Sequence, residues 1–230
     1  MTTQTLRWRG GWVRLGTWRG SDGLASLTLG AESPPSPEFV GECIERLREC
    51  GYTSVVTNAL TAADSLPFVD AGFRVRERLH LLAHDMADIP EPHIATRRAR
   101  RRDRPGVLTL DAEAFEPFWR LDAQGLTDAL AATPSSRFRT IREDEGITAY
   151  GIAGRAGRQG YIQRIAVDPS HRRSGRGRAL IADALVWLNG RGARRTVVNT
   201  QERNTGAFLL YEACGFEKLP VGLSVLGRDL

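Results

Sequence analysis

The sequence has few of the features that mark membrane, secreted or metal-binding proteins. No apolar run approaches the roughly 18 residues that span a bilayer, and the N-terminus MTTQTLRWRGGWVRLG lacks the apolar core of a secretory signal. The three cysteines, Cys43, Cys50 and Cys214, have neither an even count nor metal-site spacing. We therefore expect a soluble cytoplasmic protein with no disulfides, no metal site and no membrane contact.

Lysine is almost missing as well. Lys218 is the single lysine among 32 basic residues, so the other 31 are arginine, against 27 acidic residues. Guanidinium groups suit phosphate because they can donate two hydrogen bonds to it at once. A net charge of +5 and a pI near 9.6 favour anionic partners without choosing among nucleotide, nucleic acid and acidic protein.

The composition is that of an ordinary globular protein, with 41% hydrophobic and 26% charged residues. At 230 residues, one large domain and one domain with a smaller partner are both compatible with the length. Glycine turns and apolar periodicity predict a series of elements in the first part of the chain. These are antiparallel strands within 1–30, a helix at 38–50, a strand at 52–59, a helix at 61–71 and a strand at 73–86.

An arginine- and proline-rich stretch follows at 87–105 and is typical of a solvated linker. It predicts a division into a first domain at 1–86, this linker, and a second domain at 106–230. The second domain is expected to begin with a strand at 107–110, followed by one or two helices within 112–132 that are broken at Pro117 and Gly125. Strands at 137–143, 146–154 and 160–168, a helix at 174–188, a strand at 194–200, a helix at 204–214 and two short terminal strands follow.

The most informative stretch joins the strand at 160–168 to the amphipathic helix at 174–188. It carries Arg172, Gly175 and Gly177 in the pattern Arg-x-x-Gly-x-Gly. Glycines at this junction let backbone N–H groups face a ligand, and the helix N-terminus adds unpaired donors and a positive dipole end. We expect this loop to hold a pyrophosphate. No Gly-Lys-Ser/Thr follows, so it is not a P-loop, and it lacks the third glycine of the dinucleotide fingerprint.

A second pattern lies on the next helix, as Asn204-x-x-Ala207-x-x-x-Tyr211-x-x-x-Gly215-Phe216. The two patterns in this order resemble the GNAT superfamily of acyl-CoA N-acyltransferases. The resemblance covers 107–230. It implies a mixed, mostly antiparallel α/β sheet flanked by helices, with acetyl-CoA as cosubstrate.

Carried onto this sequence, the resemblance implies a set of roles. Backbone groups of a splayed strand would pair with pantetheine, loop amides would hold the pyrophosphate, and Asn204 would hydrogen-bond the pantetheine arm. A neutral amine would attack the thioester directly in a ternary complex, and Tyr211 would protonate the departing thiolate, since a phenol is protonated at neutral pH. The implied cofactor-binding residues are Ile165, Ala166, Val167, Arg172, Arg173, Ser174, Gly175, Arg176, Gly177, Arg178 and Asn204.

The sequence does not identify the general base that would accept the amine proton. Some family members carry a glutamate five residues before the asparagine, and this sequence has Asn199 there, which is a poor proton acceptor. Glu202 lies nearby but is equally compatible with a helix cap. Asn199 and Glu202 are the candidates for this step, with a held water as the other possibility. Cys214 is expected to be a small buried hydrophobe.

The first half of the chain repeats part of the second. In the first half, a strand and a helix are followed by Gly72-Phe73, just as the later strand and helix are followed by Gly215-Phe216. Phe68 occupies the position in this repeat that corresponds to Tyr211. Phenylalanine has no proton to give, and the prolines of AESPPSP remove amide donors. We expect a smaller, degenerate GNAT-like copy at 1–86, similar to the tandem arrangement of mycothiol-synthase-like members.

The sequence therefore predicts an N-acetyltransferase that moves an acetyl group from acetyl-CoA to a primary amine of unidentified nature. Two alternatives stay open. One is a nucleic-acid-associated protein that uses the arginine run at 97–104, although no known DNA-reading motif accompanies it. The other is an acyl-CoA-binding module without turnover, against which the presence of Tyr211 argues.

Overall fold

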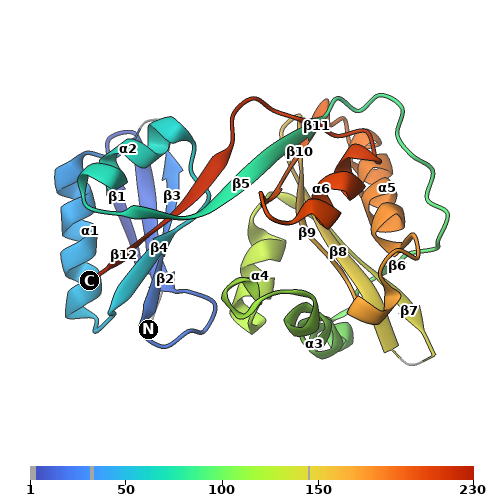
Figure 1. The fold of residues 1–230 in the computed structure, drawn as a ribbon, viewed down its shortest axis with the longest axis horizontal. Helices are drawn as coiled ribbons and strands as arrows, with labels where there is room; N and C mark the ends of the chain where they lie inside the picture. Colours follow the sequence, from blue (N-terminus) through green and yellow to red (C-terminus); the bar gives the residue numbers. More distant parts are fainter. Residues whose placement is uncertain (1–3, 32–33, 145) are drawn as a thin grey trace. The chain divides into compact units, whose positions relative to one another are not determined.

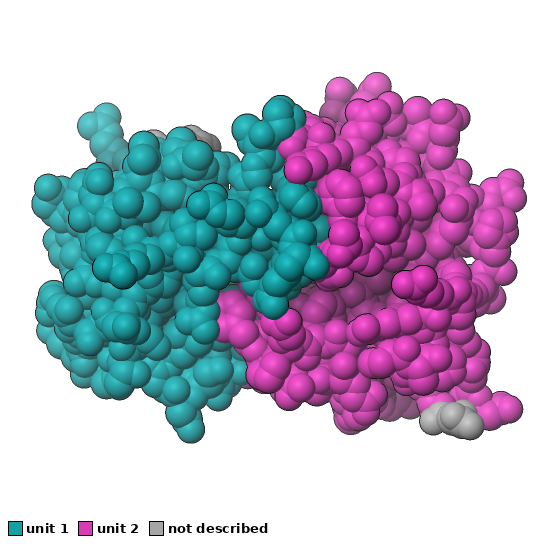
Figure 2. All heavy atoms as spheres, in the orientation of Figure 1, with its two compact units in different colours: residues 1–81, 199–203, 220–230 teal, residues 82–198, 204–219 magenta. Residues whose placement is uncertain are grey.

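The computed structural model describes residues 4–31, 34–144 and 146–230. The chain divides into two compact units, coloured separately in Figure 2. Unit 1 contains residues 1–81, 199–203 and 220–230, and unit 2 contains residues 82–198 and 204–219. Both are mixed α/β units in which most strand pairs are antiparallel and helices cover the sheet.

Unit 1 has the strand order β1-β2-β3-β4-β12-β5, with β3 and β4 as its parallel pair. Helix α1 begins at Pro37 because the Ser36 side chain caps it, and its apolar face enters the core beside that of α2. The elements are β1 (Gln4–Trp8), β2 (Gly11–Thr17), β3 (Leu24–Ala31), α1 (Pro37–Glu49), β4 (Ser54–Thr57), α2 (Ala62–Asp70), β5 (Arg74–His84) and β12 (Leu223–Asp229).

Unit 2 has the strand order β10-β9-β8-β7-β6, with β9 and β10 parallel (Figure 1). The short strand β11 (Glu217–Lys218) pairs with the end of β5. The strands are β6 (Arg97–Arg98), β7 (Ser135–Glu143), β8 (Gly146–Ala156), β9 (Gln159–Val167) and β10 (Arg195–Gln201), the last of which enters unit 1 at its end. The helices are η1 (Arg101–Asp103), α3 (Arg104–Ala114), η2 (Pro117–Trp119), α4 (Ala123–Ala131), η3 (Pro169–His171), α5 (Arg176–Asn189) and α6 (Thr205–Glu212).

The two faces of the unit 2 sheet carry different helices, because side chains alternate along each strand. Tyr150, Ile152 and Ala166 pack against α3 and α4 on one face. Ala153 and Ile162 pack against α5 and α6 on the other. The two motif-bearing helices therefore share one face of the sheet.

Three sequence predictions in this region were wrong. Residues 107–110 form part of helix α3 and not a strand, since buried Val107 and Leu110 sit one turn apart and a short apolar run does not separate the two states. Gly125 lies inside α4, where its N–H is bonded by the N-cap Asp122. Residues 97–105 are not a free linker, because they form β6, η1 and the start of α3.

Most other predicted elements are confirmed, including the hairpin β7–β8 and helices α1, α2, α5 and α6. The predicted ranges 1–86, 87–105 and 106–230 differ from the compact units. Unit 1 ends at Leu81 and also contains 199–203 and 220–230, and the predicted linker belongs to unit 2. Strand β12 lies between β4 and β5 in unit 1, where it pairs antiparallel with both.

The two units repeat one order of elements. Three antiparallel strands are followed by a crossover helix and a parallel strand, as β1-β2-β3-α1-β4 in unit 1 and β7-β8-β9-α5-β10 in unit 2. A further helix follows in each case, and both Gly72 and Gly215, just after it, have φ +86°. The ring pairs Phe68–Phe73 and Tyr211–Phe216 are both edge-on, with centroids 5.5 and 5.7 Å apart.

Candidate functional site

Strand β9 is open along one edge in its second half. Its parallel ladder with β10 runs from Gln159–Arg195 to Tyr161–Val197 and stops there. Its antiparallel ladder with β8 continues to Val167 and contains a bulge at Gln163. The sequence-predicted residues Ile165, Ala166 and Val167 thus lie where backbone groups of β9 have, among the described residues, a neighbouring strand on one side only. Such a row can bind an extended amide-containing chain as an added strand would.

The loop that follows β9 presents a row of unbonded backbone donors. Gly175 (φ +83°) is the N-cap of α5 and Arg173 (φ +59°) also has left-handed geometry, which turns successive N–H groups the same way. In the described part of the chain, the N–H groups of residues 173–178 have no hydrogen-bond acceptor. Together with the helix dipole, these donors favour an anion at this point.

Three of the four arginine side chains of this loop form hydrogen bonds or ion pairs within the protein, which the sequence did not suggest. Arg176 forms an ion pair with Glu143 and donates to Thr148 Oγ1 at 3.1 Å. Arg172 donates to the Ala114 carbonyl and Arg178 to the Ala213 carbonyl, both at 3.3 Å. These three arginines fix the loop and its helix, whereas the exposed Arg173 has no such contact with a described residue.

Gly177 has a packing role that the sequence did not reveal. It is buried, and a Cβ atom placed there would lie 2.8 Å from Leu210 Cδ2 on α6. The absence of a side chain therefore lets the start of α5 approach α6 closely. Because a substitution at Gly177 would disturb this packing, it does not separate anion binding from folding.

Asn204 and Tyr211 stand at the two ends of α6. Asn204 is the N-cap, and its Oδ1 accepts a hydrogen bond from the Ala207 N–H at 3.1 Å. Tyr211 is buried to 7% exposure among Phe216, Cys214 and residues of α5 and β9. Burial raises the pKa of its phenol, and the positive charge of Arg164 acts in the opposite direction. The hydroxyl therefore keeps its proton at neutral pH. Cys214 is buried, as predicted.

The structure does not group all the predicted residues in one unit. Asn199 and Glu202 belong to unit 1, whereas the loop, Asn204 and Tyr211 belong to unit 2. Asn199 is exposed, and Glu202 Oε1 lies 4.0 Å from His80 Nδ1.

A buried charged network in unit 2 was missed by the sequence analysis. Asp111 on α3 is fully buried and accepts two hydrogen bonds of 2.8 Å from Arg164 on β9. The Tyr150 hydroxyl also donates to it, as does the Leu121 N–H at 2.7 Å. The guanidinium of Arg164 further lies 3.5 Å from the Phe115 ring centre. No sequence signal pointed to this network, because its members come from three separate elements.

The described residues contain neither a metal-binding group of side chains nor a membrane-spanning helix. Across 4–31, 34–144 and 146–230, no three His, Cys, Asp or Glu side chains are grouped so that they could hold a metal ion. Within the same ranges, none of the helices has both the length and the apolar character needed to cross a bilayer.

Comparison with known proteins gives consistent results. The profile of the acetyltransferase (GNAT) family matches residues 104–216. Mycothiol acetyltransferase of Salinispora arenicola is 31% identical over 178 residues, which make up 65% of this chain and 55% of that protein. The same enzyme of Salinispora tropica is 30% identical over 176 residues, with the same coverage. The chain thus spans about half the length of these two relatives.

Solved structures show the same fold at low identity. A GCN5-related N-acetyltransferase from Kribbella flavida aligns with TM-score 0.68 at 18% identity, covering 99% of this chain and 90% of that one. A tandem GNAT protein from the clavulanic acid biosynthesis pathway aligns with TM-score 0.66 at 14% identity, covering 96% and 79%.

Proposed function

Because residues 104–216 match the profile of the GNAT acetyltransferase family, we propose that this protein is an acetyl-CoA-dependent N-acetyltransferase. It transfers the acetyl group to a primary amine by direct attack in a ternary complex. The observation that carries the proposal is the run of unbonded N–H groups at 173–178, next to the open edge of β9 and on the same sheet face as Tyr211.

The loop amides would hold the pyrophosphate of coenzyme A. Phosphate oxygens accept strongly from backbone N–H groups at a helix N-terminus. The N–H groups at the start of α5 have no acceptor among the residues that the structure describes. The exposed guanidinium of Arg173 stands beside the amides and adds positive charge. Arg172, Arg176 and Arg178 contribute by fixing the loop.

The open edge of β9 would bind the pantetheine arm, whose two amide groups can pair with backbone groups of Ile165–Val167. Asn204 stands at the start of α6, and its Oδ1 is already used by the helix cap. Its Nδ2 would therefore make the contact with the arm, since a side-chain amide carries two donors there.

Tyr211 would assist the departure of sulfur. Acetyl-CoA, when bound, supplies an activated acyl carbonyl and a thiolate leaving group. The Tyr211 hydroxyl holds its proton in the resting protein, because burial raises its pKa, and donates as negative charge develops beside it. For the amine proton, the chain offers the carboxylate of Glu202 or a water molecule. Asn199 could only position such a water.

An acetyl-CoA turnover assay that detects the free thiol tests the proposal across amines of different classes. A terminal peptide amine, an aminoglycoside and a small metabolite amine form the panel, because the acceptor class is open. We expect thiol release that depends on one class of amine. If coenzyme A is released no faster with any amine of a broad panel than it is without amine, N-acetyl transfer is contradicted. That result would favour a binding module without turnover.

Arg173 allows a direct test of the phosphate site. Replacing Arg173 with glutamate puts a carboxylate beside the amide row, where it competes with phosphate and repels it. We expect acetyl-CoA to bind at least about tenfold more weakly, equivalent to roughly 1.4 kcal/mol. Titration calorimetry measures the change, and added salt should reduce the difference between variant and wild type.

Arg158→Glu is the matched control, because Arg158 is exposed in the turn between β8 and β9, at the opposite end of β9 from the loop. The same charge change there should leave the affinity nearly unaltered. Equal losses in both variants would mean that only the overall positive charge attracts the cofactor.

The degenerate character of unit 1 predicts one bound acetyl-CoA per chain. Phe68 offers no hydroxyl, and Pro34, Pro35 and Pro37 have no N–H where the active loop has its donors. Glu32 and Ser33 of the same segment lie outside the described residues. Equilibrium dialysis at acetyl-CoA concentrations near the affinity of the α5 loop should give a stoichiometry of one, and two molecules bound with comparable affinity would contradict the degenerate character of unit 1.

A further inference from the structure

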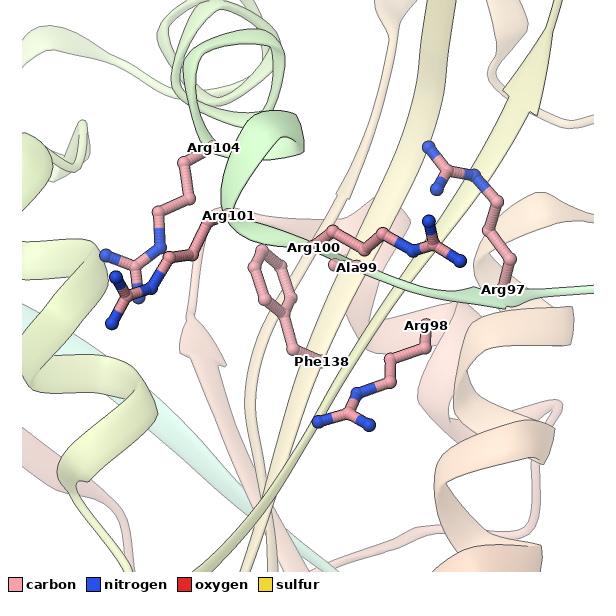
Figure 3. A pocket seen from close by; sticks show the side chains of 7 residues that line it. All are labelled: Arg97, Arg98, Ala99, Arg100, Arg101, Arg104 and Phe138. Atoms are coloured by element: carbon pink, nitrogen blue, oxygen red, sulfur yellow. The ribbon is translucent and has the colours of Figure 1, made fainter.

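The arginine run at 97–104 has no part in the proposed transfer reaction, and the structure gives it a definite shape. Five arginines surround a hollow of about 480 Å³, drawn in Figure 3. Phe138 of β7 and Ala99 complete its lining. The five arginines are Arg97 and Arg98 of β6, Arg100, Arg101 of η1 and Arg104 at the start of α3.

One of the five charges is neutralised inside the protein. Arg97 donates to both carboxylate oxygens of Asp103, at 2.9 and 3.1 Å, and Asp103 is 3% exposed. The Arg100 N–H donates to the same carboxylate at 2.7 Å. This buried carboxylate fixes the backbone of the run, so the hollow has a defined form.

The other four guanidinium groups have no acidic partner. Arg98, Arg100, Arg101 and Arg104 form no ion pair with any residue in the described ranges. Like charges held close together repel one another, and this repulsion is relieved when an anion binds among them. A rigid backbone that gathers four unpaired arginines is thus prepared for a ligand with several negative charges.

The arrangement around the ring narrows the class of ligand. Of the four unpaired arginines, Figure 3 shows Arg101 and Arg104 extending to one side of the Phe138 ring, Arg100 extending to the other, and Arg98 lying below it in this view. The unpaired positive charge is therefore spread around an aromatic surface and is not gathered at one point. A ligand with separated anionic groups and a flat ring matches this better than a single small anion does. The volume is that of a small-molecule site.

We propose that this hollow binds a phosphate ester with at least two phosphate groups and an aromatic base, as found in nucleoside polyphosphates and single-stranded nucleic acid. Guanidinium groups bond phosphate oxygens two at a time. The exposed part of Phe138 offers the base an apolar surface, as aromatic side chains do in nucleic-acid-binding grooves.

The test compares two double variants with equal loss of charge. Arg101→Gln/Arg104→Gln removes two guanidinium groups from the hollow. Arg102→Gln/Arg158→Gln removes two exposed ones that do not line it, one of them from the same run. Binding of ATP, tripolyphosphate and a fluorescent single-stranded oligonucleotide is measured for each protein. All the proteins compared, the parent included, also carry Arg173→Glu, which weakens phosphate binding at the α5 loop, and this parent takes the place of the wild type in the comparison.

The hollow variant should bind ATP or the oligonucleotide at least about tenfold more weakly than this parent, while the control pair changes less than about twofold. Whichever of ATP and the oligonucleotide binds more tightly identifies the source of the phosphate ester. Phe138→Leu should weaken ATP binding severalfold and leave tripolyphosphate unchanged, because only ATP has a base to contact the ring. Melting temperatures confirm that each variant is folded.

Three outcomes would overturn the proposal. The first is absence of binding by the parent protein, and the second is an equal loss in both double variants. The third is equally tight, arginine-dependent binding of polyglutamate, which would make the hollow a general anion surface. None of the three depends on whether the acetyl transfer proposed above takes place.

Discussion

Replacing Tyr211 with phenylalanine should lower acetyl-CoA turnover by about 10²–10⁴-fold, the usual contribution of a general acid. The change removes one hydroxyl and keeps the ring. The apolar contacts with Phe216 and Cys214 should therefore persist. We expect the affinity for acetyl-CoA to change by much less than the roughly tenfold that 1.4 kcal/mol would produce. Single-turnover kinetics and calorimetry on the same preparation measure the two quantities separately.

Tyr161→Phe is the matched control, because Tyr161 lies on β9 in the same unit but within the part of the strand that still pairs with β10. Its turnover should equal that of the wild type. Unchanged turnover in Tyr211→Phe would make Tyr211 a packing residue, with the thiolate leaving without its help. A large fall in melting temperature would instead identify the hydroxyl as a structural hydrogen bond.

Replacing Asp111 with asparagine should cost about 3–5 kcal/mol of unfolding free energy, the range found when one member of a buried ion pair is removed. Asp111 is fully buried and accepts from Arg164, Tyr150 and Leu121. The neutral amide leaves the Arg164 charge uncompensated and turns an acceptor into a donor. Denaturant titration of the full chain measures the loss.

Asp128→Asn is the corresponding control, since Asp128 is an exposed residue of α4 that accepts a single hydrogen bond from Gln124. It should change stability by less than about 0.5 kcal/mol. Tyr150→Phe is a milder probe of the same network and should cost about 1 kcal/mol. A loss below 1 kcal/mol in Asp111→Asn would mean that the network is not a main contributor to stability.

The parts of the site that the sequence predicted are those determined by short-range backbone geometry. The glycine loop and the amphipathic helix after it follow from local spacing, as does the short helix that follows Asn204. The burial of Cys214 follows in the same way, since Ala207, Tyr211 and Cys214 have the spacing of one face of the predicted helix at 204–214. Each of these features is decided within a few residues.

The parts that were not predicted depend on partners distant in sequence. Arg176 is held by Glu143, and Asp111 by Arg164, at separations of 33 and 53 residues. Periodicity carries no information about such pairs. Val107–Leu110 was misread because a short apolar run fits a buried strand and a buried helix equally well. The buried Asp103 that organises the arginine run likewise looked like one more charge in a polar stretch.

The position of β12 has a consequence for biosynthesis. Unit 1 needs this strand between β4 and β5, yet the ribosome makes it only after all of unit 2. At about 5–20 residues per second, the 1–81 segment waits roughly 7–30 s with strand edges unpaired. Unit 2, whose residues are complete at Leu219, can fold first. The order of folding is then the reverse of the order of synthesis, and the early segment is the part of the nascent chain that most needs protection from aggregation.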